Sequence, residues 1–414
     1  MARSLSSRFD ANTGPKRILA LDGGGVKGIL TLGMMKALER ELRRRSNNPN
    51  FVLSDYYDLI GGTSTGAIIS AGLALGNSVD ALIDMYLDLG PKVFGKQVGD
   101  GGLFRSKFDP KALRAALDPV LGRKTLGSPD LRTGLALHAK RIDTGSAWVL
   151  ANNPNGKFFD PENPDEGVVP NKRYRLIDLV QASAAAPTFF DEVVIPIAYD
   201  EHERVTQRAY FVDGAVSGNN NPSMSLLLLA LLPGYGFSWK SGAQNLMMTS
   251  FGTGVRRPEI DGESFRGQPP GLRGVHSLKS MIYDSQVQGI TLLQALSEPQ
   301  MPWRINGEIG DMGGQRITPE PLLDFQRIDV RLDRKSRAKP KRGQRASPTY
   351  IEEILGRELT AAVIDQLDDM ANGKPANMRL LLEIGEAAGP RFAHAKYPSP
   401  AFDPPDWTSW ALAS

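Results

Sequence analysis

A serine lies in the short run GTSTG, residues 62–66, where a strand-like segment gives way to a helix-like one. The run matches the G-x-S-x-G elbow, a tight turn that holds its serine strained and exposed at the head of a helix. Gly62 and Gly66 suit such a turn because neighbouring backbone leaves no room for a Cβ atom. The helix N-terminus would place amides and positive potential beside the Ser64 hydroxyl. The pattern predicts an activated nucleophile; the alternative is a glycine turn capped by serine.

A second glycine-rich turn, DGGGVKG at residues 22–28, also lies between a predicted strand and a predicted helix. Consecutive glycines can expose backbone amides to the negative oxygen that develops in acyl transfer. The amides of Gly24, Gly25 and Val26 are therefore candidates for an oxyanion hole. Lys27 could add positive charge there or simply cap a surface.

The same run fits the G-x-G-x-x-G fingerprint of dinucleotide-binding sites through Gly23, Gly25 and Gly28. Such a site also needs an acid about 20 residues further on, at the end of a second strand. The acids near that offset, Glu39 and Glu41, fall inside a predicted helix. Dinucleotide binding therefore stays the weaker interpretation of this turn.

A carboxylate ends another apolar run, FVDGA at residues 211–215. Catalytic groups gather at the C-terminal ends of strands in open parallel sheets, so Asp213, followed by Gly214, could face Ser64. The alternative is an ordinary turn, because Asp-Gly is a frequent turn pair.

The elements that must position these residues alternate along the chain. RILALDGGG begins as a strand and leads into the helical pattern GILTLGMMKALERELRRR, and YYDLIGG and STGAIISAGLALG repeat that order. This alternation predicts an α/β fold, with a mainly parallel sheet and helices on both faces. Further strands are expected at 135–142, 147–150, 208–214 and 245–254, and helices at 79–90, 110–121, before Pro187 and before Pro233.

Composition excludes several classes of function. Basic and acidic residues nearly cancel, 49 against 46, so nucleic acid is not expected as the main partner. The chain has no cysteine and four scattered histidines, so neither thiol chemistry nor a metal site is expected, and no cofactor is implied. The N-terminus lacks the apolar core of a signal peptide, and the apolar run at 224–233 is too short to span a bilayer. We expect a soluble, cytoplasmic protein that contacts membranes only peripherally.

The three motifs, in this order and spacing, resemble those of the patatin-like phospholipases. The resemblance covers residues 15–255 and extends to the shorter strings ASAAAPTFF, NNP and SFGTG. It implies a three-layer α/β/α fold and a serine-aspartate dyad, with Ser64 as nucleophile, Asp213 as base and the glycine-loop amides as oxyanion hole. The implied activity is hydrolysis of fatty-acid esters in phospholipids or lysophospholipids. The family's acid motif is often DGG, and here it is DGA.

Two alternatives within the enzyme interpretation stay open. The order Ser64, Asp213, then His276 or His394 also satisfies the Ser-acid-His order of α/β-hydrolases. Some bacterial patatin-like proteins are effectors switched on by cyclic nucleotides, and the C-terminal region could hold such a function.

The expected organisation has four parts. They are a flexible N-terminal arm (1–14), a patatin-like catalytic domain (15–330), a basic linker or loop (331–345) and a helical C-terminal region of unknown role (346–414).

Overall fold

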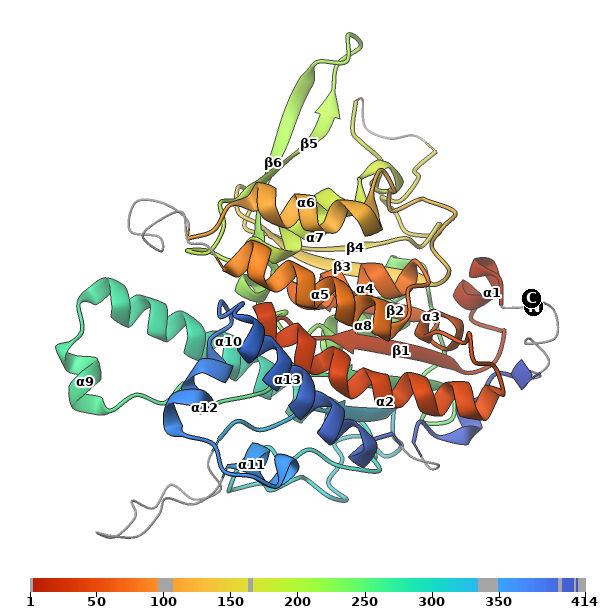
Figure 1. Cartoon of the computed structure of the whole chain (residues 1–414). Helices are drawn as coiled ribbons and strands as arrows, with labels where there is room; N and C mark the ends of the chain where they lie inside the picture. The colour runs from red at the N-terminus through yellow and green to blue at the C-terminus, as the bar shows by residue number, and fades with distance from the viewer. Residues whose placement is uncertain are drawn as a thin grey trace, which may run out of the picture.

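The computed structural model describes residues 3–95, 107–162, 167–333, 349–393, 397–405 and 407–408. Its centre is an eight-stranded sheet with the strand order β5-β6-β3-β2-β1-β7-β8, in which β4 pairs with β3 off this path (Figure 1). The strands are β1 (Lys16–Leu21), β2 (Leu59–Thr63), β3 (Gly134–Arg141), β4 (Ala147–Ala151), β5 (Val193–Tyr199), β6 (Val205–Asp213), β7 (Leu246–Phe251) and β8 (Asp324–Ile328).

The middle of the sheet is parallel and one side is antiparallel. β1 pairs in parallel with β2 and β7, while β2 pairs in parallel with β3 and β7 with β8. β3, β6 and β5 form antiparallel pairs, as do β3 and β4. The predicted α/β class with a mainly parallel sheet is therefore confirmed.

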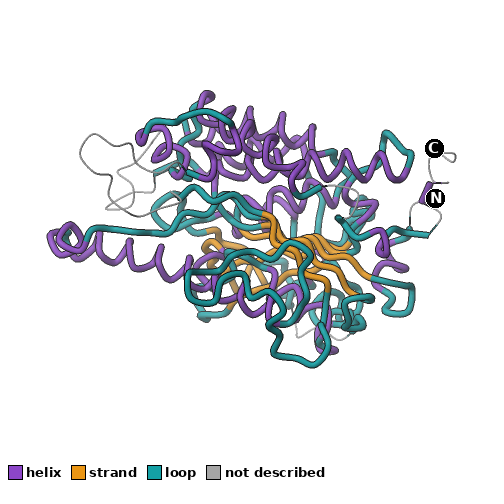
Figure 2. Tube along the Cα trace, turned by 90° about the horizontal axis from the view of Figure 1, so that it is seen from below, coloured by secondary structure: helices purple, strands orange, loops and turns teal. Residues whose placement is uncertain are grey.

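Helices cover both faces of the sheet, and Figure 2 shows the thicker helical layer on one side of the strands. That layer contains α2 (Gly28–Ser46), α4 (Thr65–Ala74), α5 (Val79–Phe94), α6 (Pro110–Leu121), α7 (Leu176–Ala184) and α13 (Pro375–Ala388). The opposite face carries α1 (Leu5–Phe9), α8 (Ser223–Leu231) and the end of α10 (Pro270–Ala295). The remaining helices are α3 (Leu53–Tyr56), α9 (Gly262–Gly267), α11 (Tyr350–Leu355) and α12 (Ala361–Asp368).

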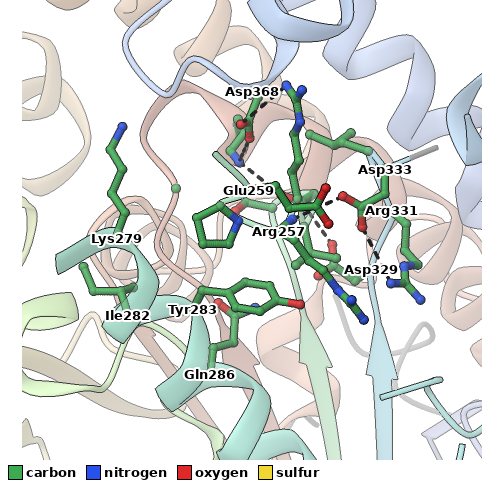
Figure 3. A pocket seen from close by; sticks show the side chains of 18 of the residues that line it. Arg257, Glu259, Lys279, Ile282, Tyr283, Gln286, Asp329, Arg331, Asp333 and Asp368 are labelled. Atoms are coloured by element: carbon green, nitrogen blue, oxygen red, sulfur yellow. Dashed lines mark hydrogen bonds and ion pairs between the residues drawn. The ribbon is translucent and has the colours of Figure 1, made fainter. Parts of the chain in front are cut away.

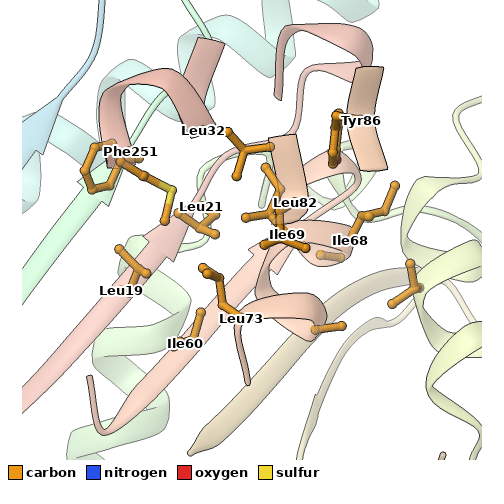
Figure 4. Close-up of a cluster of buried hydrophobic side chains, with 14 of the residues drawn as sticks. Leu19, Leu21, Leu32, Ile60, Ile68, Ile69, Leu73, Leu82, Tyr86 and Phe251 are labelled. Atoms are coloured by element: carbon orange, nitrogen blue, oxygen red, sulfur yellow. The ribbon is translucent and has the colours of Figure 1, made fainter. Parts of the chain in front are cut away.

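Alternation along β1 divides the apolar core between the two faces. Leu19 and Leu21 belong to the cluster under the thicker helical layer, whereas Ile18 and Ala20 belong to the cluster on the other face. Figure 4 shows Leu19 and Leu21 among the side chains of α2, α4 and α5. A strand that is buried on both faces favours a continuous apolar run, which explains the segment ILAL that marked β1 in the sequence.

Most elements expected from the sequence are present, but β5 and β8 were missed. β5 contains Pro196, which argues against a strand in a sequence reading. β8 reads DFQRI and looks like a surface segment, although all five residues are buried. Its polar side chains have partners inside the protein, so burial did not require apolar residues there: Gln326 bonds the Met301 backbone and Arg327 bonds Asp22.

The described residues near both ends of the chain pack against the body. The prediction of a flexible N-terminal arm is wrong for residues 5–9, because they form α1 with Arg8 and Phe9 buried. Arg8 donates a 2.7 Å hydrogen bond to the Tyr57 carbonyl, which fastens the helix to the body. At the other end, α13 packs against α2, and the rings of Trp407 and Phe51 meet edge to face. The expected basic linker lies almost wholly outside the described residues.

None of the helices in the described part of the chain is both long enough and apolar enough to cross a bilayer. α9 and the first half of α10 project from the body (Figures 1 and 2). Leu272 and Met281 are exposed on α10, at 57% and 69%.

Candidate active site

The GTSTG run forms the strained turn that its glycines predicted. β2 ends at Thr63, α4 begins at Thr65, and Ser64 between them has φ 56° and ψ −123°, a conformation that non-glycine residues rarely adopt. A Cβ atom on Gly62 would collide with the Gly66 backbone, and one on Gly66 would collide with the Leu21 carbonyl. This crowding is the reason why both flanking positions are glycine.

Hydrogen bonds from a third element hold the turn in its strained form. The Ser64 amide donates to the Ser183 hydroxyl at 2.9 Å, and that hydroxyl donates to the His138 carbonyl at 2.6 Å. Ser183 lies in the string ASAAAPTFF, which the sequence analysis noted without giving this serine a role. Strain at a functional residue persists only where surrounding contacts over-determine it, and Ser183 supplies such a contact.

Asp213 lies at the end of a strand whose direction differs from the expected one. We expected the C-terminal end of a parallel strand, but β6 runs antiparallel to β3 and ends beside its middle, with Asp213 opposite Ala139. On the other edge of β3, His138 lies opposite Thr63, the residue before Ser64. The antiparallel strand therefore brings the carboxylate to the level of the elbow.

Ser64 and Asp213 line one cavity of about 210 Å³. Burial raises the pKa of the Asp213 carboxyl to about 6, while a side-chain hydrogen bond with Ser64 and the Ala215 amide act in the opposite direction. That amide donates to Asp213 Oδ1 at 2.9 Å and fixes the carboxylate. An acid with a pKa near 6 is a far better base for a serine hydroxyl at neutral pH than a solvated aspartate.

The glycine loop supplies two available amides. Gly24 and Gly25 line the same cavity, and their amides donate to no other group within the described ranges. Val26 was expected to be a third donor, but its amide donates to the Met370 carbonyl at 2.9 Å. The predicted oxyanion role of Val26 is therefore wrong, because the C-terminal segment already occupies that amide.

The remaining predicted motif residues hold the glycine loop and the Asp213 turn in place. The Lys27 ammonium is buried and donates to the Gly254 carbonyl at 3.1 Å and to Asp368 at 3.3 Å, so it braces the loop and does not line the cavity. Gly23 donates its amide to the Asn220 carbonyl at 3.0 Å. Added Cβ atoms on Gly28 and Gly214 would collide with Thr65 and with the His138 carbonyl.

A buried ionic cluster at the start of this loop was missed in the sequence. Arg327 of β8 binds both carboxylate oxygens of Asp22, at 3.0 and 2.6 Å, and also binds Asp329 at 2.8 Å. The amides of Asn221 and Gln286 donate to the same Asp22 carboxylate at 2.7 and 3.1 Å. Burial raises the pKa of Asp22 to about 6, although Arg327 opposes the shift. Asp22 begins the DGGGVKG run and Asn221 lies in the string NNP, but no sequence pattern indicated their partner Arg327.

We expect Arg327→Met to lower the free energy of unfolding by about 3–5 kcal/mol, because it leaves Asp22 and Asp329 buried without their cation. Denaturant unfolding followed by circular dichroism measures the change. The matched control is Arg357→Met, which breaks an exposed ion pair with Glu383 and should cost at most about 1 kcal/mol. Equal losses for the two variants would contradict the structural role of Arg327.

None of the described histidines lines the cavity of Ser64 and Asp213. His138 is buried in β3, where burial lowers the pKa of its imidazole to about 4, and its Nε2 lies 3.0 Å from the Ser225 hydroxyl. His202 is exposed beside Glu201, and His276 lies on the wall of a neighbouring hollow. His394 lies outside the described residues. The geometry gives no support to a triad through His276.

The dinucleotide alternative also lacks the strand-end acid that such a site needs. Glu39 lies inside α2 and pairs with Arg43 at 2.6 Å, so it does not stand at the end of a strand beside the glycine loop. The described part of the chain contains no cluster of three or more residues with metal-binding side chains.

Most of the remaining cavity wall is apolar and comes from several elements. Thr188, Phe189 and Phe190 line it, whereas the leucine-rich helix α8 packs into the core on the other face of the sheet. The other apolar wall residues are Ile68, Tyr86, Leu89, Phe94, Leu113, Ala184, Ala186, Pro187, Ala215, Val216, Val275, Leu278, Ile282 and Met370.

Comparison with known proteins places this geometry in a family. The model of the family described as "Patatin-like phospholipase" matches residues 19–227, which include Ser64 and Asp213. A "cGAMP-activated phospholipase" of Escherichia coli (strain TW11681) is 30% identical over 215 residues, which are 51% of this chain and 55% of that protein. Patatin-T5 of Solanum tuberosum is 27% identical over 250 residues, 58% of this chain and 60% of that protein.

Among solved structures, human GIVD cytosolic phospholipase A2 aligns with a TM-score of 0.45 at 10% identity, covering 94% of this chain and 61% of that one. The matched regions thus span less than two thirds of the length of each of these relatives.

Proposed function

Because this chain belongs to the patatin-like phospholipase family, we propose that it is a lipid acyl hydrolase of phospholipase A or lysophospholipase type that uses a Ser64–Asp213 dyad. The observation that supports this proposal is that Ser64, Asp213, Gly24 and Gly25 line one mostly apolar cavity, and that the Gly24 and Gly25 amides have no other acceptor within the described ranges. An apolar wall suits a fatty acyl chain, and the polar groups gather where its ester would react.

The first half of the reaction is acylation. The Asp213 carboxylate accepts the proton of the Ser64 hydroxyl as the serine oxygen forms a bond to the ester carbonyl carbon. The carbonyl oxygen becomes negative and is stabilised by the Gly24 and Gly25 amides. Collapse of this intermediate breaks the bond to the alcohol oxygen, which leaves with the proton from Asp213.

The second half is hydrolysis of the acyl-enzyme. A water molecule gives a proton to Asp213 and attacks the acyl carbon, and the same amides stabilise the second oxyanion. The fatty acid is released as Ser64 takes its proton back from Asp213. The dyad returns to its starting state, so a single carboxyl group transfers the proton in both halves.

Labelling with a fluorophosphonate probe tests the nucleophile and the reaction class together. We expect the probe to modify Ser64 alone, because only an activated serine displaces fluoride from phosphorus. Peptide mapping by mass spectrometry identifies the modified residue, and Ser64→Ala should remove the label. Modification of a different serine, or none at the concentrations that label known serine hydrolases, would count against the proposal.

A hydrolase switched on by a cyclic nucleotide is the second candidate. The name of the Escherichia coli relative describes activation by cGAMP. The observation that favours such control here is a hollow of about 1270 Å³ beside the glycine loop, whose lining includes several arginines. Equal rates with and without cyclic GMP–AMP would count against it.

A further inference from the structure

Two cavities meet at the glycine loop. The smaller, of about 210 Å³, holds Ser64 and Asp213, and we call the larger hollow of about 1270 Å³ the basin (Figure 3). Because both are lined by some of the same residues, they adjoin each other at the loop. The shared lining consists of Gly24, Asn220, Lys279, Ile282 and Met370.

The two cavities differ in chemistry. Apart from Ser64, Asp213 and the glycine-loop amides, the small cavity has mostly apolar walls. The basin is bordered by charged side chains of both signs. The cations are Lys27, Arg256, Arg257, Lys279, Arg304 and Arg331, and the carboxylates are Glu259, Asp329, Asp333, Asp365 and Asp368.

Several of these cations are already paired inside the protein. Lys27 pairs with Asp368 at 3.3 Å, Arg256 with Asp365 at 2.8 Å and Arg331 with Asp333 at 3.6 Å. The side chains of Arg257, Lys279 and Arg304, in contrast, form neither an ion pair nor a hydrogen bond with any residue that the structure describes, since Arg257 contacts Asp333 only through its backbone amide. These three cations are therefore free to bind an anion, and Lys279 and Arg304 are the two whose backbone amides are also not tied to a carboxylate.

Lys279 stands at the boundary between the two cavities. Val275, Leu278 and Ile282 lie on one face of α10 and line the small cavity, and Lys279 falls on that same face. It is the only cationic side chain on the described wall of the small cavity. Figure 3 shows it apart from the group formed by Arg257, Arg331 and Asp333.

The position of the loop decides which part of an ester enters which cavity. An ester carbonyl bound at Gly24 and Gly25 carries an acyl chain on one side and an alcohol on the other. The acyl chain fits the apolar cavity, so the alcohol points into the basin. We propose that the basin binds the phosphodiester of a glycerophospholipid headgroup, held by Lys279 and Arg304, and that Lys279 determines the preference for phosphate-bearing esters. This inference rests on the proposed hydrolase function.

The test compares two short-chain substrates with identical acyl groups. Dihexanoylphosphatidylcholine, used below its micellar concentration, carries the phosphodiester, and 1,2-dihexanoylglycerol lacks it. We expect Lys279→Gln to lower the ratio of their kcat/KM values by about tenfold, because an exposed charge-assisted hydrogen bond to phosphate is lost. Lys279→Glu should lower the ratio further. The matched control is Lys240→Gln, an exposed lysine remote from both cavities, which should leave the ratio unchanged.

The same assay shows whether the basin binds the headgroup of the lipid substrate or a free phosphodiester such as a cyclic dinucleotide. If the basin holds the headgroup, cyclic GMP–AMP should compete with dihexanoylphosphatidylcholine in the wild type and compete less in Lys279→Gln. Activation by the cyclic dinucleotide on both substrates would overturn the headgroup assignment, as would an unchanged ratio in Lys279→Gln. Absence of hydrolysis of both substrates, with no fluorophosphonate labelling, would instead refute the proposed function itself.

Discussion

Ser64→Ala is expected to lower kcat/KM for a short-chain ester by at least about 10⁴-fold, the largest effect of any single substitution in this protein. Without the hydroxyl no acyl-enzyme can form, and direct attack by water would have only the oxyanion amides to assist it. A fluorogenic ester assay with active-site titration measures the loss. The fold should survive, because alanine at φ 56° has about the same backbone strain as serine.

Ser70→Ala is the matched control for that experiment. Ser70 lies on the same helix, α4, is fully buried, and does not line the cavity, so it reports the effect of deleting a hydroxyl near the elbow. Its kcat/KM should stay within about threefold of the wild type. Hydrolysis that survives in Ser64→Ala would refute the proposed nucleophile.

Asp213→Asn is expected to lower kcat/KM by about 10³-fold, because the amide cannot accept the proton of Ser64. The side chain keeps its shape, and the amide oxygen can still accept the hydrogen bond from the Ala215 amide. Stability should not fall. Burial raises the folded-state pKa of Asp213 to about 6, above the ordinary value near 4, so the ionised carboxylate destabilises the fold at neutral pH. A neutral side chain removes that cost.

The pH dependence of the wild type follows from the same carboxyl group. Only the ionised form can act as base, so kcat/KM should fall tenfold for each pH unit below about 6 and level off above it. The neutral dihexanoylglycerol is the proper substrate, because it does not ionise in this range. The residual activity of Asp213→Asn should lack this acidic limb, that is, the fall in kcat/KM below about pH 6. A limb that persists in the variant would assign the titration to another group, such as Asp22.

Asp324→Asn is the control for both measurements. Asp324 is buried at the start of β8, burial raises its pKa to about 6 as well, and it does not line the cavity. Removing its charge should leave both kcat/KM and the acidic limb intact. If Asp324→Asn and Asp213→Asn lost activity equally, the loss would reflect general damage and not a base at position 213.

The residues proposed for chemistry could be found in the sequence because their backbone settings are local. A strained elbow needs glycine on either side of its serine, and a loop that exposes amides needs consecutive glycines, so GTSTG and DGGGVKG signal their geometry within a few residues. The alternation of strand and helix patterns fixed the α/β class for the same reason, because each pattern depends on near neighbours.

The surroundings of those residues depend on contacts between distant parts of the chain. Asp213 reaches Ser64 through an antiparallel strand, although we had assumed a parallel one. The Val26 amide is occupied by Met370, and Asp22 is held by Arg327, two partners more than 300 positions away in the chain. No short motif encodes such pairs, because each requires knowledge of which elements become neighbours.

The sequence by itself therefore determined the family resemblance, the fold class and the candidate dyad, all of which follow from local backbone requirements and ordered motifs. Only the tertiary structure decided which amides stay available, what raises the pKa of Asp213 and which cavity adjoins the glycine loop. The physical reason is that burial and pairing belong to the packed molecule: a carboxyl group or an amide acquires its chemistry from groups that folding brings to it.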